Sequence, residues 1–124
     1  MSSVPENLKY TKTHEWVSIS GNVATIGITD YAQHQLTDIV FVDFPMAGEA
    51  RKKQSVLLTV ESVKSAEDVF SPVDGEIMEA NRALVDSPEL LNKDSYANWM
   101  VKMKISSIPP DLLTPAQYRK HIGE

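Results

Sequence analysis

The sequence predicts a mostly β domain of barrel or sandwich type, with short helices at its margins. Short runs of β-branched and apolar residues recur along the chain, and small polar or turn-forming residues separate them. No segment between two such runs is long enough for the crossover helix that a parallel βαβ fold requires. The 124 residues are 42% hydrophobic and 23% charged. These values are typical of a globular domain that buries its own core.

We expect seven strands and three short helices. The strands are expected over residues 15–19, 23–28, 39–44, 56–60, 69–73, 76–80 and 99–105, and the helices over residues 31–36, 87–91 and 114–121. The first two strands are joined by Ser20-Gly21-Asn22, which favours a hairpin. Thr29 or Asp30 can cap the first helix, because either side chain accepts hydrogen bonds from free backbone amides. The third strand is rich in β-branched and aromatic residues, and Pro45 ends it.

The second half of the chain follows the same rules. The fourth and fifth strands flank a polar tip and are expected to form a second hairpin, and Asp74-Gly75 opens the sixth strand. Ser87 as a cap and Pro88 at the first helical position predict the second helix, because an amide at that position has no helical partner. The seventh strand alternates and ends at Pro109-Pro110. Thr114-Pro115 repeats the cap-and-proline start and predicts a C-terminal helix.

The whole chain is expected to form one domain, residues 1–124. Its core is predicted at about residues 10–106, and a C-terminal helical segment at about residues 110–121. The chain contains one short internal repeat, since Gly48-Glu49-Ala50 and Gly75-Glu76-Ile77 each open a strand pair after a turn. This repeat suggests that the domain has duplicated halves.

Charge and hydropathy exclude two classes of partner. The formal net charge is −5, and the densest basic cluster, Arg51-Lys52-Lys53, is short, so we expect no nucleic-acid binding. The longest apolar run is far below the roughly 20 residues of a membrane span, so we expect no membrane insertion. The first residues lack the charged-then-apolar layout of a secretory signal and the Arg-rich, acid-poor character of an organelle presequence. We therefore expect a cytoplasmic protein, with the mitochondrial matrix as the location only of a processed eukaryotic form.

The chain lacks the residue patterns of most catalytic centres. It has no cysteine, so any dithiol would have to arrive on a cofactor. No nucleophile elbow, phosphate loop or dinucleotide fingerprint is present. The three histidines, His14, His34 and His121, are scattered, and we expect none of them to pair with a carboxylate four residues away. We therefore expect no catalytic residue and no metal site.

Lys64 is the strongest candidate for chemistry, because it lies at the tip of the second predicted hairpin. Its neighbours Ser62, Ser65 and Ala66 are small and leave the amine accessible. Three acidic residues bracket it and are expected to form a recognition surface, since exposed carboxylates are poor acids at neutral pH: Glu61, Glu67 and Asp68. On these observations alone, Lys64 is either an enzymatically modified lysine or an ordinary exposed one.

Six segments carry a resemblance to a known family. They are Lys9-Tyr-Thr-Lys-Thr-His-Glu-Trp16, Val23-Ala-Thr-Ile-Gly-Ile-Thr-Asp30, Asp38-Ile-Val-Phe-Val-Asp-Phe-Pro45, Val60-Glu-Ser-Val-Lys-Ser65, Ser71-Pro-Val-Asp-Gly-Glu76 and Pro88-Glu-Leu-Leu-Asn92. In this order they resemble the lipoyl-carrying H proteins of the glycine cleavage system, from about Tyr10 to Tyr118. The resemblance implies a barrel-sandwich hybrid fold, like that of lipoyl and biotinyl domains, and a non-catalytic carrier subunit.

The resemblance also implies a cofactor and partners. Lipoic acid would be joined by an amide to Lys64, which removes the positive charge of the lysine. Around it, Glu61, Ser62, Val63, Ser65 and Glu67 would be recognised by a lipoate ligase or an octanoyl or lipoyl transferase. The arm would take an aminomethyl group from a pyridoxal-phosphate glycine decarboxylase and deliver it to a tetrahydrofolate-dependent aminomethyltransferase. A dihydrolipoamide dehydrogenase would then reoxidise the dithiol.

In family members the loaded arm folds into a surface cleft. Carried over, Glu15 and Asp68 would face the amine, and an apolar wall would consist of Ile28, Ala32 and Leu36. Carboxylates can hold a cationic amine, and a closed cleft shields it from water. The alternative is that Glu15 is a charge at a strand edge and the three apolar residues belong to the core.

Some positions depart from the family pattern. Ser65 follows the lysine where many members have alanine, and Gln35 stands where a histidine often lines the cleft. Residues 94–99 replace a more usual Pro-Tyr and Gly-Trp pattern, which predicts a loop of different shape. Lys102 and Lys104 lie near methionines as in biotin carriers, but on an alternating strand, so we expect no biotin there.

Two other functions remain open on the sequence. The chain could pass its lipoyl group to other lipoyl domains as a relay, or it could be an unmodified β domain that only binds proteins.

Overall fold

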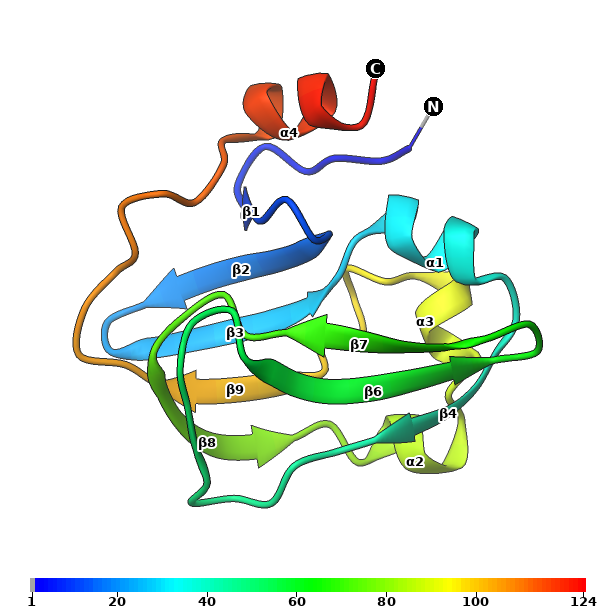
Figure 1. Cartoon of the computed structure of the whole chain (residues 1–124), viewed down its shortest axis with the longest axis horizontal. Helices are drawn as coiled ribbons and strands as arrows, with labels where there is room; N and C mark the ends of the chain where they lie inside the picture. Colours follow the sequence, from blue (N-terminus) through cyan, green and yellow to red (C-terminus); the bar gives the residue numbers. More distant parts are fainter. Residues whose placement is uncertain (1) are drawn as a thin grey trace.

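The computed structural model describes residues 2–124 and confirms the predicted mostly β, barrel-sandwich architecture (Figure 1). The strands are β1 (Lys9–Tyr10), β2 (Glu15–Ser20), β3 (Val23–Ile28), β4 (Ile39–Asp43), β5 (Ala50–Arg51), β6 (Val56–Ser62), β7 (Ala66–Phe70), β8 (Gly75–Ala80) and β9 (Val101–Lys104). The helices are α1 (Asp30–Leu36), α2 (Ala83–Asp86), α3 (Leu90–Lys93) and α4 (Pro115–His121).

Two antiparallel sheets enclose the main core. The larger sheet has the strand order β1-β2-β3-β9-β8-β5, and the smaller has the order β4-β6-β7. In Figure 1 the β6–β7 hairpin lies over the strands of the larger sheet. Ile26, Ile77 and Met103 of the larger sheet and Leu58 and Val60 of the smaller belong to one buried cluster. Burial of these apolar side chains is the main force that holds the sheets together.

The first predicted hairpin is confirmed. Strands β2 and β3 pair over six residues, from Glu15 opposite Ile28 to Ser20 opposite Val23. Gly21 has a φ of 60°, a left-handed conformation that glycine adopts without steric cost, so the two-residue turn can close. This register places Glu15 at the end of the hairpin where α1 begins.

Two helices begin as predicted. The Thr29 hydroxyl accepts from the Ala32 amide, so Thr29 and not Asp30 caps α1. Thr114 caps α4 through a reciprocal pair of bonds with Gln117.

The position of the fifth predicted strand was wrong. The prediction places it over residues 69–73, but β7 begins three residues earlier and ends at Phe70. The chain leaves the sheet there, because the Ser71 hydroxyl donates to the Val73 carbonyl at 2.7 Å and Pro72 has no amide to donate to a ladder. As a result, only three residues form the hairpin tip.

The helix predicted over residues 87–91 is confirmed only in part, because α3 begins at Leu90 and Ser87 does not cap it with its side chain. Two short helices, α2 and α3, flank this residue, and neither has a side-chain cap bond. Ser87 contributes its backbone carbonyl, which accepts from the Leu90 amide at 3.1 Å. The strands β1 and β5 and the helix α2 were missed, because elements of two to four residues are too short to show periodicity.

The repeated Gly-Glu segments are neighbours in space. Ala50 of β5 lies opposite Glu76 of β8, and the Gly48 amide donates to the Ile77 carbonyl at 2.8 Å. The two segments therefore pair with each other.

The two termini lie side by side, next to α4 (Figure 1). A second buried cluster joins them to the larger sheet and contains Val4, Leu8, Tyr10, Trp16 and Tyr118. The Arg119 guanidinium also donates to the Val4 carbonyl at 2.9 Å. The C-terminal helix is thus packed against the N-terminal segment and β1–β2.

We predict that Gly75→Ala destabilises the fold by about 2 kcal/mol, a typical cost of forced overpacking. A β-carbon at Gly75 would collide with the Lys104 backbone carbonyl oxygen. The strand β9 cannot retreat without losing its ladder to β8, where Glu76 pairs with Lys104. Urea unfolding measures the change. Glu76→Ala, an exposed neighbour, is the control, and equal stability of the two variants would contradict the prediction.

Candidate functional site

A three-residue tip joins β6 to β7 and carries Lys64. The Ser62 hydroxyl accepts from the backbone amides of Lys64 and Ser65, at 3.3 and 3.2 Å. The Ser62 amide in turn donates to the Ser65 carbonyl at 2.8 Å. Lys64 is exposed, and its amine has no hydrogen bond or ion pair within residues 2–124. The tip is therefore held by Ser62, while the Lys64 side chain stays exposed.

Lys64 borders a cleft of about 370 Å³ that contains every predicted arm-contact residue. Its lining comes from the turn before β2, the end of β3, α1, the hairpin tip and β7: Thr13, His14, Glu15, Ile28, Tyr31, Ala32, Gln35, Leu36, Lys64, Ser65, Glu67, Asp68 and Val69. The structure thus brings together residues that are up to 56 positions apart in the chain, between Thr13 and Val69. The cleft runs from an accessible amine to a buried carboxylate.

The apolar residues that line this cleft are also packed in the hydrophobic core. Ile28 and Leu36 are 2% and 8% exposed and belong to the main buried cluster, and Ala32 packs against that cluster. All three also line the cleft. The two interpretations weighed on the sequence, core and cleft wall, therefore both describe them. Gln35 lies exposed on α1 at the rim.

The residues predicted for recognition around Lys64 differ in their exposure. Glu61, Val63 and Glu67 are exposed, whereas Ser62 is buried. Ser65 and Glu67 also line the cleft, together with the exposed carboxylate of Asp68. The three acidic side chains Glu61, Glu67 and Asp68 are exposed on β6 and β7, as the predicted acidic surface requires.

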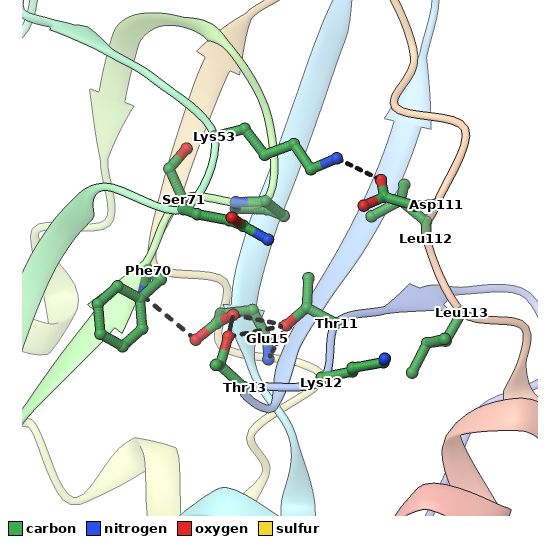
Figure 2. Close-up of a pocket in the computed structure, with 12 residues that line it drawn as sticks. Thr11, Lys12, Thr13, Glu15, Lys53, Phe70, Ser71, Asp111, Leu112 and Leu113 are labelled. Carbon is green, nitrogen blue, oxygen red and sulfur yellow. Dashed lines mark hydrogen bonds and ion pairs between the residues drawn. The ribbon is translucent and has the colours of Figure 1, made fainter.

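Glu15 is a buried acid, not a charge on an open strand edge. It is 2% exposed, and one of its carboxylate oxygens accepts from the hydroxyls of Thr11 and Thr13 (Figure 2). The other oxygen accepts from the Phe70 amide at 3.3 Å. Burial raises the pKa of Glu15, and these donors oppose the shift because they stabilise the ionised form.

The Glu15 carboxylate separates two cavities. Behind it lies a larger cavity of about 490 Å³, lined in part by Thr11, Phe70 and Leu112 (Figure 2). A Lys53–Asp111 ion pair also borders this cavity. Lys64 is not part of its lining. Of these two cavities, only the smaller is bordered by Lys64.

A histidine connects the cleft to the C-terminal helix. The His14 ring lies 4.7 Å from the Tyr31 ring, centroid to centroid, and its Nδ1 lies 2.8 Å from the Tyr118 hydroxyl. The His121 ring is 5.7 Å away on its other side. Burial lowers the pKa of His14, and the neighbouring His121 lowers it further.

We predict that His14 makes the fold less stable in weak acid. Its pKa in the folded chain is below the ordinary value of 6.5, so the unfolded chain binds more protons. Stability is therefore retained above about pH 6.5 and falls as the pH decreases through and below that value. Urea unfolding between pH 8 and pH 5 tests this. His14→Gln should flatten the profile and the exposed His34→Gln should not; parallel profiles of all three proteins would refute the prediction.

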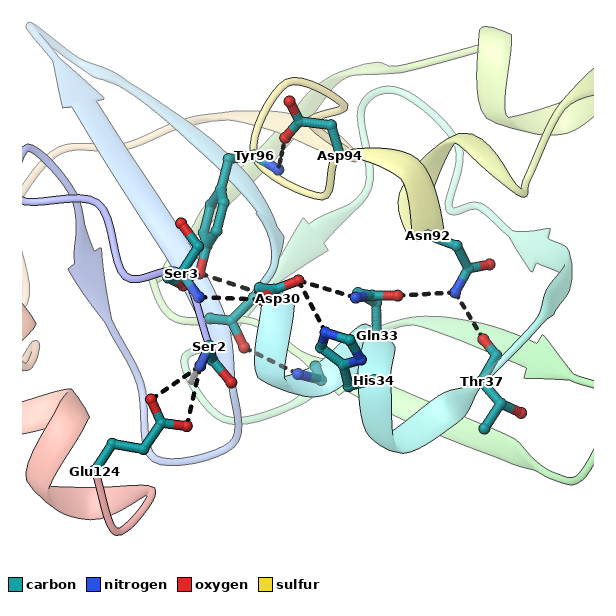
Figure 3. Close-up of polar contacts among 12 residues, drawn as sticks. Ser2, Ser3, Asp30, Gln33, His34, Thr37, Asn92, Asp94, Tyr96 and Glu124 are labelled. Atoms are coloured by element: carbon teal, nitrogen blue, oxygen red, sulfur yellow. Dashed lines mark hydrogen bonds and ion pairs between the residues drawn. The ribbon is translucent and has the colours of Figure 1, made fainter.

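A polar network fixes α1, one wall of the cleft (Figure 3). The Asp30 carboxylate accepts from the Ser3 amide at 3.0 Å and from the Gln33 side chain at 2.9 Å. Asn92 of α3 donates to the Gln33 side chain at 3.0 Å and to the Thr37 carbonyl at 2.7 Å. These bonds tie both ends of α1 to the rest of the fold.

The unusual segment 94–99 forms an ordered turn. The Asp94 carboxylate accepts from the amides of Tyr96 and Ala97, at 3.1 and 3.0 Å. The Tyr96 hydroxyl accepts from the Asp30 amide and donates to the Ser3 carbonyl. This segment therefore supports α1 as well.

Sequence reasoning missed four residues of the cleft lining and Thr11, which bonds to Glu15; the four are Thr13, His14, Tyr31 and Val69. Thr11 and Thr13 lie in a turn, in which the His14 amide donates to the Thr11 carbonyl at 3.2 Å, so strand alternation gives no signal for these two threonines. The side-by-side position of His14 and His121 depends on the docking of α4 and leaves no local signal.

The expectation that no histidine pairs with a carboxylate four residues away was wrong. His34 Nε2 lies 3.6 Å from the Asp30 carboxylate, because such residues share one face of a helix. Within residues 2–124 no group of three or more histidine, aspartate and glutamate side chains is arranged to hold a metal. The helices of the same residues include none with the length and hydropathy of a membrane span.

Comparisons with known proteins converge on one family. A family model described as "Glycine cleavage H-protein" matches residues 8–124. A "Probable glycine cleavage system H protein" of Picrophilus torridus is 61% identical over 124 residues, which is all of both chains. A glycine cleavage system H protein of Herpetosiphon aurantiacus is 46% identical over 100% of this chain and 97% of its own. The crystal structure of a glycine cleavage system H protein from Mycobacterium marinum superimposes with a TM-score of 0.91, at 33% identity over 98% of this chain and 100% of its own.

Proposed function

Because this chain belongs to the glycine cleavage H-protein family, we propose that it bears its lipoyl group on Lys64 and shelters the loaded arm in the adjacent cleft. Members of the family are lipoyl carriers without catalytic activity, and this chain is such a carrier subunit. The observation that supports the proposal best is the continuity of one surface, from the exposed Lys64 to the buried Glu15.

The residues around Lys64 fit a long, mostly apolar arm that is attached to the lysine amine. The tip is held by Ser62, so the point of attachment stays fixed while the lysine side chain moves. Next to it, Ile28, Ala32 and Leu36 offer an apolar wall. The cleft volume of about 370 Å³ lies within the usual range for small-molecule sites.

When bound, the lipoyl group supplies a dithiol, which a chain without cysteine does not have. The protein's own contribution is to hold and protect a cationic amine at the end of the arm. Glu15 is buried and keeps lone pairs free beyond its three donors, and Asp68 adds a second carboxylate at the cleft. In a site closed to bulk water this pairing is stronger than in solution, and hydrolysis of the carried group is slowed.

We propose the same sequence of partners that the resemblance implies. A lipoate ligase or an octanoyl or lipoyl transferase attaches the arm at the exposed tip. The arm then visits a pyridoxal-phosphate glycine decarboxylase, a tetrahydrofolate-dependent aminomethyltransferase and a dihydrolipoamide dehydrogenase in the cytoplasm. A flexible arm on a fixed tip raises the effective concentration of the carried group at each enzyme. The acidic side chains Glu61, Glu67 and Asp68 stay accessible to all of them.

Reconstitution tests this function. The lipoylated chain is combined with the decarboxylase, and exchange of labelled carbon dioxide into glycine is measured. We expect exchange that requires the lipoylated chain and is absent with the unmodified one. Lipoylated chain that supports no exchange would contradict a role in glycine cleavage and favour a lipoyl relay.

A further inference from the structure

Tyr118 of α4 contacts His14, which lines the arm cleft, and Thr29, which caps α1. It is completely buried, and its ring stacks on Tyr10 with centroids 4.7 Å apart and planes at 13°. Its hydroxyl lies 2.8 Å from His14 Nδ1 and 2.7 Å from the Thr29 hydroxyl oxygen. Burial raises the pKa of Tyr118, so the hydroxyl keeps its proton at neutral pH.

The two partners are neighbours at the end of the β2–β3 hairpin, where the Thr29 amide bonds to the His14 carbonyl. His14 lines the cleft directly and precedes Glu15, in a turn closed by the Thr11 amide on the Glu15 carbonyl at 3.0 Å. His14 holds a φ of 75°, so this turn is kept in a conformation that few non-glycine residues adopt. Thr29 caps α1, the helix that supplies Ala32, Gln35 and Leu36 to one wall of the cleft.

Several hydrogen bonds hold Thr29 and His14 in place. The Thr29 hydroxyl already accepts from the Ala32 amide, and the Thr29 amide donates to the His14 carbonyl at 3.0 Å. A tyrosine hydroxyl has one proton and two lone pairs, so it can serve both His14 and Thr29 at once. Without it, the half-buried His14 ring nitrogen would lose this partner, and the buried Thr29 hydroxyl would keep only the Ala32 amide, which is costly.

We propose that Tyr118 is a positioning residue for the arm cleft: from the C-terminal helix, its hydroxyl joins the backbone bond between Thr29 and His14 in holding the Glu15 turn against the start of α1. This inference rests on the proposed function only in taking the cleft as the place of the loaded arm. The helix α4 contributes no residue to the cleft lining, but through Tyr118 it would affect how well the cleft holds the loaded arm.

The first test uses the unmodified chain and two matched variants. Tyr118→Phe removes the hydroxyl and keeps the ring. Tyr10→Phe removes the hydroxyl of the stacked partner, which donates to the Pro5 carbonyl at 2.7 Å, away from the cleft. We expect NMR to show changed ring-nitrogen shifts of His14 and changed amide shifts in residues 13–15 and 29–36 for Tyr118→Phe alone. Equal changes in both variants, or none in either, would overturn the inference.

The second test uses lipoylated, amine-loaded protein. Loss of one hydrogen bond corresponds to roughly a three- to tenfold change, so we expect Tyr118→Phe to release the amine about three- to tenfold faster than Tyr10→Phe. Equal release rates would overturn the inference. If Lys64 takes no lipoyl group in any variant, the proposed function fails, while the NMR comparison still decides the role of Tyr118.

Discussion

Lys64→Arg is expected to abolish lipoylation and reduce glycine–carbon dioxide exchange to the level without the chain. Attachment requires a primary amine that can lose a proton and form an amide, and the guanidinium of arginine does not deprotonate in proteins. Arginine keeps the positive charge and nearly the length of the side chain. Because the Lys64 side chain is exposed and makes no hydrogen bond or ion pair within residues 2–124, the thermal midpoint of the variant should not change.

The control for this variant is Lys93→Arg on α3, which is also exposed. It should be lipoylated and support exchange like the parent chain. Intact mass and exchange rate are measured on the same preparations. Full exchange by the Lys64→Arg chain would mean that another lysine carries the arm.

Glu15→Gln is expected to release the carried amine about 10- to 100-fold faster, because hydrogen bonds to charged groups contribute about 1.5–3 kcal/mol. Glutamine fills the same space, and its one oxygen can still accept from Thr11 and Thr13, but its nitrogen cannot accept from the Phe70 amide and it has no charge to hold a cation. Release of formaldehyde and ammonia from loaded protein is the measurement. Glu61→Gln, an exposed acid outside the cleft lining, is the control.

The same substitution should not weaken the fold at neutral pH. The pKa of Glu15 is raised above its ordinary value of 4.5, so the folded chain binds the proton more tightly than the unfolded chain. The stability this provides is present below about pH 4.5 and is lost as the pH rises through the folded pKa. Glutamine does not ionise, so the Glu15→Gln chain does not lose this stability as the pH rises. Faster release together with a lower unfolding free energy at pH 7 would point to a damaged fold and contradict the assigned role.

The features that were predictable from the sequence are those encoded locally. The tip around Lys64 follows from two apolar runs with small polar residues between them, and Thr114-Pro115 marks the start of α4. The convergence of Glu15, Asp68 and α1 was predicted only through the family resemblance, because these residues come from separate elements. The structure adds the geometry: the β2–β3 register sets Glu15 opposite Ile28, next to the start of α1.

The features that were missed depend on packing between distant segments. The hydroxyl of Tyr118 meets His14 across 104 positions of the chain, and no local pattern encodes that contact. The three-residue error in β7 has a local cause, since the apolar residues after Val69 resemble a strand although Ser71 and Pro72 turn the chain out of the sheet. The pairing of His34 with Asp30 was visible from helical spacing and was overlooked.

The most direct test of the carrier assignment is the mass of the native protein and of its peptides after expression in lipoate-replete cells. We predict one lipoyl amide per chain, located on the peptide that contains Lys64 and absent after Lys64→Arg. An unmodified Lys64, or a lipoyl group found on another lysine, would contradict the assignment.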